Sequence, residues 1–298
     1  MVQVREQSYF SSDGAVDPQA WLDQLPEAEA LSKVSAERLR DALDALHDAA
    51  QIPGIDTGDW ARDSNCEWAG IESAQILAEL RVGANCLIAG LLYRAVREQR
   101  LGISDVEARF GKAVTDLLRG ALRMATIADL RNPSDAAVLE EAERQRDNIR
   151  QMLVAIVDDV QVALIKLAER TCAIRAVKSD KTRQELVARD VFDVYAPLAH
   201  RLGIGHLKWE LEDLSFRYLY NDSYMRIAKL LDGKRLERDR FVTRVIAQLR
   251  SVLGGAGIDV EVSGRSKHIY SIWRKMQRKG IGFSQVYDIR AVRIEVSE

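Results

Sequence analysis

Two hydrophobic periodicities divide this chain. Over roughly the first 255 residues, apolar side chains recur every three or four positions, as they do along one face of a helix. Examples of this spacing are Leu39, Leu43, Leu46, Leu207, Leu211 and Leu214. After residue 256 the period changes to two, because Ile258, Val260 and Val262 alternate with acidic residues. Alternation of this kind predicts a strand, so a helical region is followed by an α/β region.

Local signals predict where several helices begin and end. Asp17 before Pro18 is typical of a helix start, with proline at the first helical position. Ser104 and Glu107 have the spacing of a capping box and predict one helix through residues 105–124. A further helix is predicted around residues 149–157. The glycines at 203 and 205 are expected to end the helix marked by Val187, Val191, Val194, Leu198 and Leu202.

A second strand is predicted at residues 286–296, where apolar residues occupy both parities of the pattern. A strand of this kind is typical of the centre of a sheet that is covered on both faces. Two strands and one intervening helix do not bury a core of their own. We therefore expect the α/β region to continue beyond Glu298.

Composition and charge narrow the classes of function. The chain has 298 residues, of which 30% are charged and 47% hydrophobic, which is globular composition for about two domains. Its net charge of −2 argues against nucleic-acid binding by bulk charge, so any anion site must be local. Three widely spaced cysteines, Cys66, Cys86 and Cys172, are expected to be buried small hydrophobes. The N-terminus has no signal-peptide pattern and no uncharged run is long enough for a bilayer, so we expect a cytoplasmic protein without membrane contact.

The local exception to this charge balance is residues 263–280, which carry six lysines and arginines and no acid. At helical spacing, Ile269, Ile272, Trp273 and Met276 form an apolar stripe. The opposite face carries Lys267, Ser271, Arg274, Lys275 and Arg278. The preceding strand is expected to end at Gly264, so the helix begins at the carboxyl end of a strand, where anions often bind. Two interpretations stay open at this point: a polyphosphate site with Arg265 and Lys267 at its mouth, or a solvated basic face.

Asp288 at the second strand also has two interpretations. It is either a Mg²⁺ ligand beside substrate phosphates or the partner of Arg290 or Arg293.

Three segments in this order, YAPLAHRLGIGHLKWELEDLSFRYL, GRSKHIYSIWRKM and YDIRAVRI, closely resemble the RelA/SpoT family of (p)ppGpp synthetases and hydrolases. The chain is most similar to the monofunctional synthetases, the GTP pyrophosphokinases of the stringent response. The resemblance implies pyrophosphate transfer from ATP to the 3′-OH of GTP or GDP. It assigns ATP binding to Arg265, Lys267, Ser271, Lys275 and His268, and it makes Asp288 the catalytic carboxylate that holds Mg²⁺. In the family, a later glutamate and an Asn-Gly-Tyr segment complete the synthetase site, and both are expected beyond Glu298. Residues 1–298 are therefore expected to hold only the ATP half of the site and to be inactive alone.

The same resemblance implies an HD-type hydrolase fold for the helical region. Active members bind a metal, typically Mn²⁺, through histidines and aspartates. The matching positions here are Ala69, Tyr93, Arg94, Arg97, Glu98, Glu169 and Ala173. Alanine and tyrosine offer no imidazole, and Arg94 puts a fixed cation where the metal would bind. The alternative is that Arg94 and Arg97 simply pair with acids such as Glu98. The four histidines, His47, His200, His206 and His268, form no HxxxH or HD pattern. We therefore expect no Mn²⁺ and no (p)ppGpp hydrolysis.

The predicted organisation has three parts. Residues 1–185 form a degenerate HD-like hydrolase domain, 186–255 a connecting helical region, and 256–298 the first part of a nucleotidyltransferase-like synthetase domain. The fold class is mostly α. An alternative function is a non-catalytic regulatory module that binds (p)ppGpp or a protein partner through the helical domain, and the helical domain is also a candidate for homodimerisation. The family's ribosome-reading modules are absent from these residues.

Overall fold

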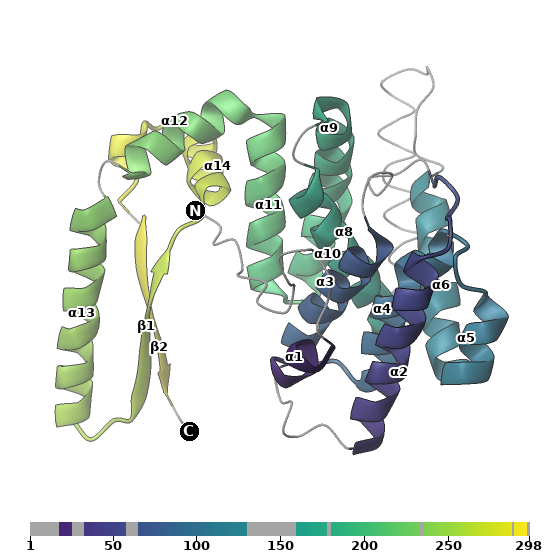
Figure 1. Cartoon of the computed structure of the whole chain (residues 1–298). Helices are drawn as coiled ribbons and strands as arrows, with labels where there is room; N and C mark the ends of the chain where they lie inside the picture. The colour runs from purple at the N-terminus through teal and green to yellow at the C-terminus, as the bar shows by residue number, and fades with distance from the viewer. Residues whose placement is uncertain are drawn as a thin grey trace. The chain divides into compact units, whose positions relative to one another are not determined.

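The computed structural model describes residues 18–25, 33–57, 65–129, 159–177, 180–232, 235–287 and 289–296. It confirms the predicted fold class, because the described chain is mostly helical with one small sheet near its C-terminal end (Figure 1). The chain forms two compact units, residues 1–187 and 188–298. The predicted three-part division into functional domains stays a prediction.

The first unit is built from helices alone in its described part. In chain order they are α1 (Pro18–Asp23), α2 (Lys33–Ala50), α3 (Cys66–Glu79), α4 (Ala84–Arg97), α5 (Ile103–Phe110), α6 (Lys112–Asp129), α8 (Val160–Ala176) and the start of α9 (Lys181–Asp190). The α3 and α4 helices pack closely, and each also contacts α8. Leu39, Leu43 and Leu46 of α2 are buried, as their spacing predicts.

Two glycines explain the closeness of α3 and α4. A Cβ on Gly70 would lie 2.3 Å from the carbonyl oxygen of Leu91, and one on Gly90 would lie 2.4 Å from the Leu77 side chain. Since real Cβ atoms do not approach so closely, larger residues at either position would push the helices apart. These helices carry most of the positions that the resemblance links to a hydrolase site.

The predicted helix boundaries in this unit are partly right. The α1 helix begins at Pro18, as expected. The capping box is wrong: Gly102 is the N-cap of α5, and Ser104 lies inside the helix. The single helix expected through residues 105–124 is divided at Gly111, whose φ of +86° suits glycine and ends α5. The helix expected at residues 149–157 lies outside the described residues.

The second unit begins within α9 and continues through a π-helical segment (Val191–Tyr195) into α10 (Ala196–Arg201). Gly203, with φ of +75°, follows the end of α10, which confirms the predicted glycine stop. The next helices along the chain are α11 (Gly205–Leu219), α12 (Asn221–Asp232) and α13 (Arg235–Gly255). Leu207 and Leu211 of α11 are buried.

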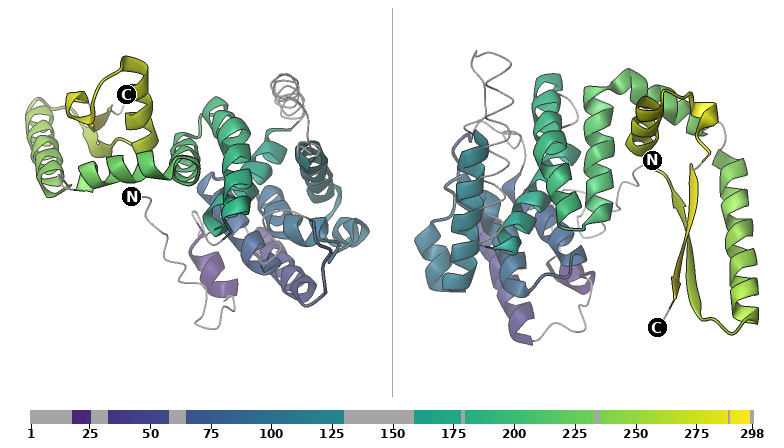
Figure 2. Two further views of the ribbon diagram at one scale, coloured as in Figure 1. Left: turned by 90° about the horizontal axis from the view of Figure 1, so that it is seen from above. Right: turned by 180° about the vertical axis from the view of Figure 1, so that it is seen from behind.

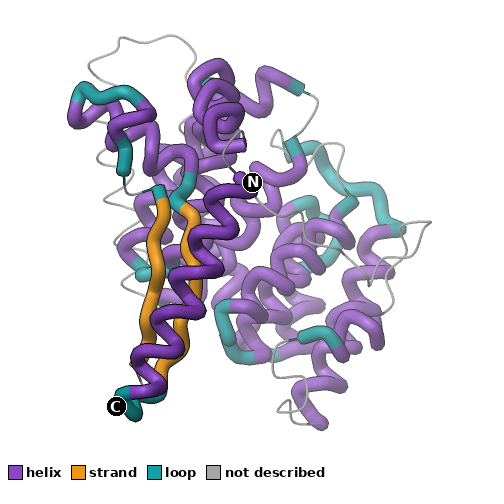
Figure 3. The backbone as a smooth tube through the Cα atoms, turned by 90° about the vertical axis from the view of Figure 1, so that its left-hand side faces the viewer, coloured by secondary structure: helices purple, strands orange, loops and turns teal. Residues whose placement is uncertain are grey.

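The sheet is an antiparallel pair of strands, β1 (Val260–Ser266) and β2 (Arg290–Val296), and α13 lies along it (Figure 3). A Cβ on Gly264 would lie 2.4 Å from Val242 Cγ1 of α13, so the glycine allows this contact. Two strand predictions need correction. The first strand extends past Gly264 to Ser266, and the second begins at Arg290 rather than 286. The second strand is also not covered on both faces, since Ile294 and Val296 are 42% and 60% exposed.

The α14 helix (Ile269–Lys279) connects the strands and packs on α11 and α12 (Figure 2). The centre of this contact is a buried cluster of Phe216, Ile227, Ile269, Ile272 and Val286, with Trp273 and Met276 partly buried against it. The predicted apolar stripe of α14 is therefore confirmed. None of the helices in the described part of the chain combines the length and apolar character that a bilayer crossing requires.

Candidate functional site

The proposed ATP residues follow one another through the β1–α14 connection. Arg265 lies within β1, where its Cα pairs with that of Ala291. Lys267 and His268 form the link, and Ser271 and Lys275 lie on α14. The Lys267 amide donates to the carbonyl oxygen of Ile289 at 3.2 Å. Asp288 lies outside the described residues, but this bond brings the main chain of its neighbour beside the proposed phosphate-binding lysine.

The cationic face of α14 is solvated to different degrees along its length. Arg274, Arg278 and Lys279 are exposed, whereas Ser271 and Lys275 are half-buried. The helix ends at Gly280, whose φ of +62° is that of a left-handed cap. The last-turn cations Arg278 and Lys279 lie near this C-terminal end, where positive charge interacts favourably with the helix dipole. Arg278 and Lys279 therefore have a role in stabilising α14 that does not depend on a bound ligand.

Asp213 of α11 binds the N-terminus of α14, and sequence reasoning did not find it. One carboxylate oxygen, Oδ1, accepts from the Tyr270 amide at 2.8 Å, and Oδ2 lies 3.4 Å from the Ile269 amide. These amides were expected to face an anionic ligand. In this structure they face a buried carboxylate of the protein itself. Phosphates bound here would therefore depend on side chains such as Lys267 more than on the helix end.

Two residues of α11 contact the His268 side chain. Its Nδ1 lies 3.3 Å from Asp213 Oδ2, and its ring stacks on Trp209 with centroids 5.1 Å apart and an interplanar angle of 18°. Trp209 and Asp213 are four residues apart, which places them on one face of α11. The signal for this pair was present in the sequence as the i, i+4 spacing within KWELED, but only packing shows what that face contacts.

The positions matched to the hydrolase metal site lie on three helices of the first unit. Ala69 is on α3, Tyr93, Arg94 and Arg97 are on α4, Glu98 caps α4, and Glu169 and Ala173 are on α8. Apart from Arg97, each of them is at most 4% exposed. The structure therefore buries these positions among three helices that contact one another.

A lysine that sequence reasoning passed over lies among these positions. Lys166 of α8 is fully buried, and its Nζ donates to the Tyr93 hydroxyl at 2.9 Å and to Glu169 Oε2 at 2.8 Å. The ammonium also lies 4.9 Å from the centre of the Tyr93 ring, within cation–π range. Arg170 Nε lies 3.3 Å from the same Glu169 oxygen. Tyr93 on α4 and Glu169 on α8, both at matched positions, thus contact the same ammonium group, that of Lys166.

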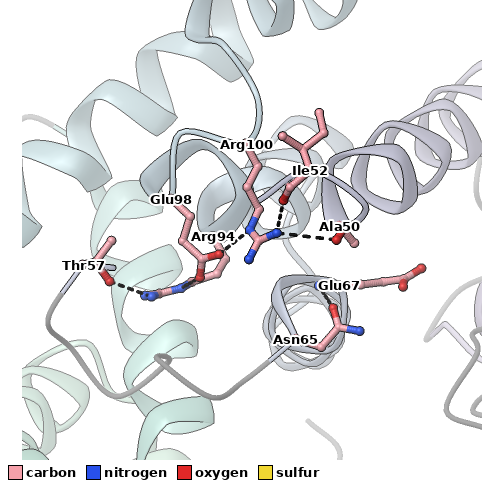
Figure 4. A network of polar contacts seen from close by, with 8 residues as sticks. All are labelled: Ala50, Ile52, Thr57, Asn65, Glu67, Arg94, Glu98 and Arg100. Atoms are coloured by element: carbon pink, nitrogen blue, oxygen red, sulfur yellow. Dashed lines mark hydrogen bonds and ion pairs between the residues drawn. The ribbon is translucent and has the colours of Figure 1, made fainter. Parts of the chain in front are cut away.

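Arg94 belongs to a second network, drawn in Figure 4. Its Nε lies 2.6 Å from Glu98 Oε1, and its Nη2 donates to Thr57 Oγ1 at 2.8 Å. Glu98 Oε2 in turn lies 2.5 Å from Arg100 Nε, and Arg100 also donates to the carbonyl of Ile52. The alternative interpretation of Arg94, pairing with Glu98, is therefore observed. The network ties the end of α4 to the segment that follows α2.

The chemistry of these side chains does not suit a divalent cation. Arginine cannot deprotonate, and a buried lysine offers a metal only repulsion while it is protonated. Glu169 already faces Lys166 and Arg170. Within the part of the chain that the structure describes, no three histidine, cysteine or acidic side chains gather as metal ligands would.

The three cysteines are free and buried, as predicted. Burial raises the pKa of the Cys66 thiol to about 11 and that of Cys86 to about 12. Burial also raises the pKa of Cys172, whose Sγ lies 3.4 Å from Ser73 Oγ. Protonated thiols are poor nucleophiles and poor metal ligands, so the cysteines belong to the hydrophobic core rather than to a reactive site.

Comparison with known proteins gives the class first. The family model described as "HD domain" matches residues 53–205, just over half of the chain, so the chain belongs to the HD domain family. A second model, "Region found in RelA / SpoT proteins", matches residues 264–298, which include the β1–α14 connection and β2. This HD-domain chain is therefore of the RelA/SpoT kind, and the resemblance found in the sequence is confirmed.

Individual relatives agree with this membership. A "GTP pyrophosphokinase" of Escherichia coli (strain K12) is 39% identical over 295 residues, 99% of this chain and 38% of the relative. One from Photobacterium angustum is 42% identical over 78% of this chain and 31% of the relative. The "Bifunctional (p)ppGpp synthase/hydrolase SpoT" of Escherichia coli (strain K12) is 37% identical over 76% of this chain and 31% of the relative. The chain thus spans less than two fifths of the length of these relatives.

Proposed function

We propose that the protein to which these residues belong synthesises (p)ppGpp in the stringent response, by moving pyrophosphate from ATP to the 3′-OH of GTP or GDP. The observation that carries this proposal is the β1–α14 connection. This connection and the helix that follows it carry Arg265, Lys267, His268, Ser271 and Lys275, in the region that matches RelA/SpoT proteins. The names of the relatives support the same reaction.

The chemistry requires charge neutralisation and alignment more than covalent participation by the protein. The 3′ oxygen of GTP or GDP would bond to the β-phosphorus of ATP and lose its proton to a general base, which the resemblance assigns to a later glutamate outside these residues. The bond between the β-phosphorus and the oxygen that bridges it to the α-phosphate would break, and AMP would leave with that oxygen. Arg265 offers a planar bidentate donor to the triphosphate, and Lys267 and Lys275 offer point charges. Asp288 would hold Mg²⁺, which polarises the transferred group when it is bound. The 298 residues contain no Asn-Gly-Tyr segment, so they would hold ATP without completing the transfer.

Calorimetry with ATP and Mg²⁺ tests this proposal directly. Wild-type chain is expected to bind, and Arg265→Ala and Lys267→Ala to bind at least about ten-fold more weakly, since each removes a charged contact to phosphate. Arg278→Ala, exposed near the C-terminal end of α14, is the matched control and should bind as wild type does. A folded wild-type chain without ATP affinity would contradict the proposal. A second comparison measures (p)ppGpp synthesis by this chain and by a longer form that includes the later glutamate.

For the HD domain we propose a fold without (p)ppGpp hydrolysis and without Mn²⁺. The supporting observation is the pair of buried cations, Lys166 and Arg94, beside Tyr93 and Glu98 at the matched ligand positions. Metal analysis of the purified protein, together with incubation with (p)ppGpp in the presence of Mn²⁺, tests this. Stoichiometric transition metal with loss of (p)ppGpp would overturn it.

A regulatory role for the HD domain is the second proposal. Its helices keep a packed core although the matched metal ligands are replaced, which favours a retained use other than hydrolysis. The candidate ligands are (p)ppGpp, a protein partner, or a second copy of the chain. Titration of the chain with (p)ppGpp, and light scattering across protein concentrations, separate these outcomes. In the whole protein we expect a cytoplasmic enzyme that responds to the ribosome through regions outside these 298 residues.

A further inference from the structure

Asp213 makes contacts far from its own place in the sequence. It lies on α11, is 6% exposed, and its two oxygens face the amides of Ile269 and Tyr270 and the imidazole of His268. All three partners are 55 to 57 positions away. The N-cap residue of α14, His268, forms no capping hydrogen bond of its own. A local serine or aspartate at that position would satisfy the amides without any help from α11. The chain instead joins the start of α14 to another helix.

The imidazole of His268 makes contacts that capping of α14 does not need. An ionised carboxylate only accepts, so the contact with Asp213 assigns the hydrogen to Nδ1. Trp209 stacks on the ring face one turn earlier on the same helix. With the Nδ1 edge and one face held, Nε2 is left as the ring's second polar atom. A hydrogen bond at one imidazole nitrogen sets the tautomer and the orientation of the ring, and so determines what the other nitrogen can contact.

The main chain on the other side is fixed as well. The Lys267 amide donates to the carbonyl oxygen of Ile289, so residues 267–270 are bonded to the residue before β2 at one end and to α11 at the other. These are the residues from which two of the proposed ATP contacts arise. Preorganised contacts of this kind raise affinity because less conformational freedom is lost on binding.

We propose that Asp213 and Trp209 are positioning residues of the ATP site, acting through His268. They hold the imidazole with Nε2 available for the nucleotide and fix the main chain that carries Lys267. This inference rests on the proposed ATP function of the β1–α14 connection. Under this proposal, α11, which belongs to the predicted connecting helical region, contacts the nucleotide-binding segment directly and fixes its conformation.

A double-mutant cycle in the full chain tests this. ATP affinity in Mg²⁺ is measured by calorimetry for wild type, Asp213→Asn, His268→Ala and the double variant, with the melting temperature of each. Asparagine keeps the shape of aspartate but has one acceptor oxygen in place of two. Each single variant is expected to lose roughly ten-fold in affinity, as for a hydrogen bond to a charged group. The double variant should be no weaker than the weaker single variant, because both act through one imidazole.

Two further variants keep the test decisive. Asp159→Ala removes the side chain that caps α8 in the first unit, where Gln161 N donates to Asp159 Oδ1 at 2.8 Å. It should lower the melting temperature without changing ATP affinity. Trp209→Leu leaves the Asp213 cap in place, removes the stack, and is expected to weaken ATP binding several-fold even if Asp213→Asn does not fold.

The outcomes separate this inference from the function on which it rests. Wild-type affinity in both Asp213→Asn and Trp209→Leu, with only the melting temperature lowered, would reduce Asp213 to a helix cap and leave the ATP proposal standing. Additive losses in the double variant would likewise overturn action through His268. A wild-type chain that does not bind ATP overturns both. Non-additive losses in the double variant, with wild-type ATP affinity in Asp159→Ala, support the positioning role.

Discussion

The ammonium of Lys166 on α8 lies 2.9 Å from the hydroxyl of Tyr93 on α4, and both side chains are buried. Tyr93 occupies a position that the family resemblance assigns to a metal-binding histidine in active hydrolases. Here that position accepts a hydrogen bond from a cation that belongs to the protein. The Lys166 contact with Glu169 adds a second matched position, so one ammonium joins two helices where an active enzyme would use a metal ion.

Replacement of Lys166 by methionine should strongly destabilise the first unit. It leaves the Glu169 carboxylate buried with a weaker set of partners, and breaking a buried ion pair from one side costs about 3 kcal/mol or more. Urea unfolding of Lys166→Met gives the free energy of unfolding. Lys112→Met, an exposed lysine at the start of α6, is the control and should change that free energy by less than about 0.5 kcal/mol. Equal stability of the two variants would contradict the structural role of Lys166.

The glycine of the GRSK segment is expected to be a packing residue. A Cβ at Gly264 would meet Val242 and Ile246 of α13, at 2.4 and 3.2 Å, so Gly264→Ala should cost about 2 kcal/mol through overpacking. Gly254→Ala is the matched control, because nothing lies within 4 Å of its Cβ and it sits inside α13. That change should stabilise the chain by roughly 0.5 kcal/mol through helix propensity. Thermal unfolding of both variants checks the difference in sign.

Glu212 on α11 should make stability depend on pH. Burial raises its pKa above the ordinary value, although Lys208 partly opposes this. A carboxyl with a raised pKa in the folded state stabilises the protein most at low pH and loses that contribution as pH rises through the folded pKa. Glu212→Gln lacks this titration. The melting temperature of Glu212→Gln minus that of wild type should therefore increase as pH rises from 4 to 7.

Glu261→Gln, on an exposed position of β1, is the control for removing a carboxylate in the same unit. A melting-temperature difference between Glu212→Gln and wild type that shrinks with rising pH would show that the Lys208 pair dominates over burial.

The thiols should be inert while the chain is folded. With the pKa of Cys66 at about 11, its thiolate fraction at pH 8 is on the order of a hundred-fold below that of a free cysteine. Reaction with a chromogenic disulfide should therefore be slow in native buffer and should reach three thiols in denaturant. Rapid release of one equivalent from native protein at pH 8 would indicate a local opening that this packing does not contain.

Much of the fold could be predicted because helix periodicity is a local property. The stripe of Ile269, Ile272, Trp273 and Met276 depends only on 3.6-residue spacing, and its burial is confirmed. Predictions that depended on one capping pattern were less secure. Ser104 and Glu107 match a capping box, but the left-handed Gly111 and the N-cap Gly102 decide where α5 lies.

In the candidate site too, residues within a local sequence motif could be predicted, whereas residues brought together from distant segments could not. Arg265 and Lys267 belong to one contiguous motif and Asp288 to a second one further along the chain, and resemblance finds such motifs. Asp213 and Trp209 lie on another helix more than fifty positions earlier, so no local pattern connects them with His268. Lys166 is visible in KLAER, but a lysine three residues before a glutamate is an ordinary surface pair on most helices.

The sequence by itself determined the helical elements, the basic face of α14, the RelA/SpoT kinship and the loss of histidines from the hydrolase positions. Only the tertiary structure decided which charges meet. It placed Lys166 against Tyr93 and Glu169, Arg94 against Glu98, and Asp213 against the start of α14. The reason is that periodicity acts along one element, whereas an ion pair or a remote cap depends on distances of a few ångströms between elements, which packing alone sets.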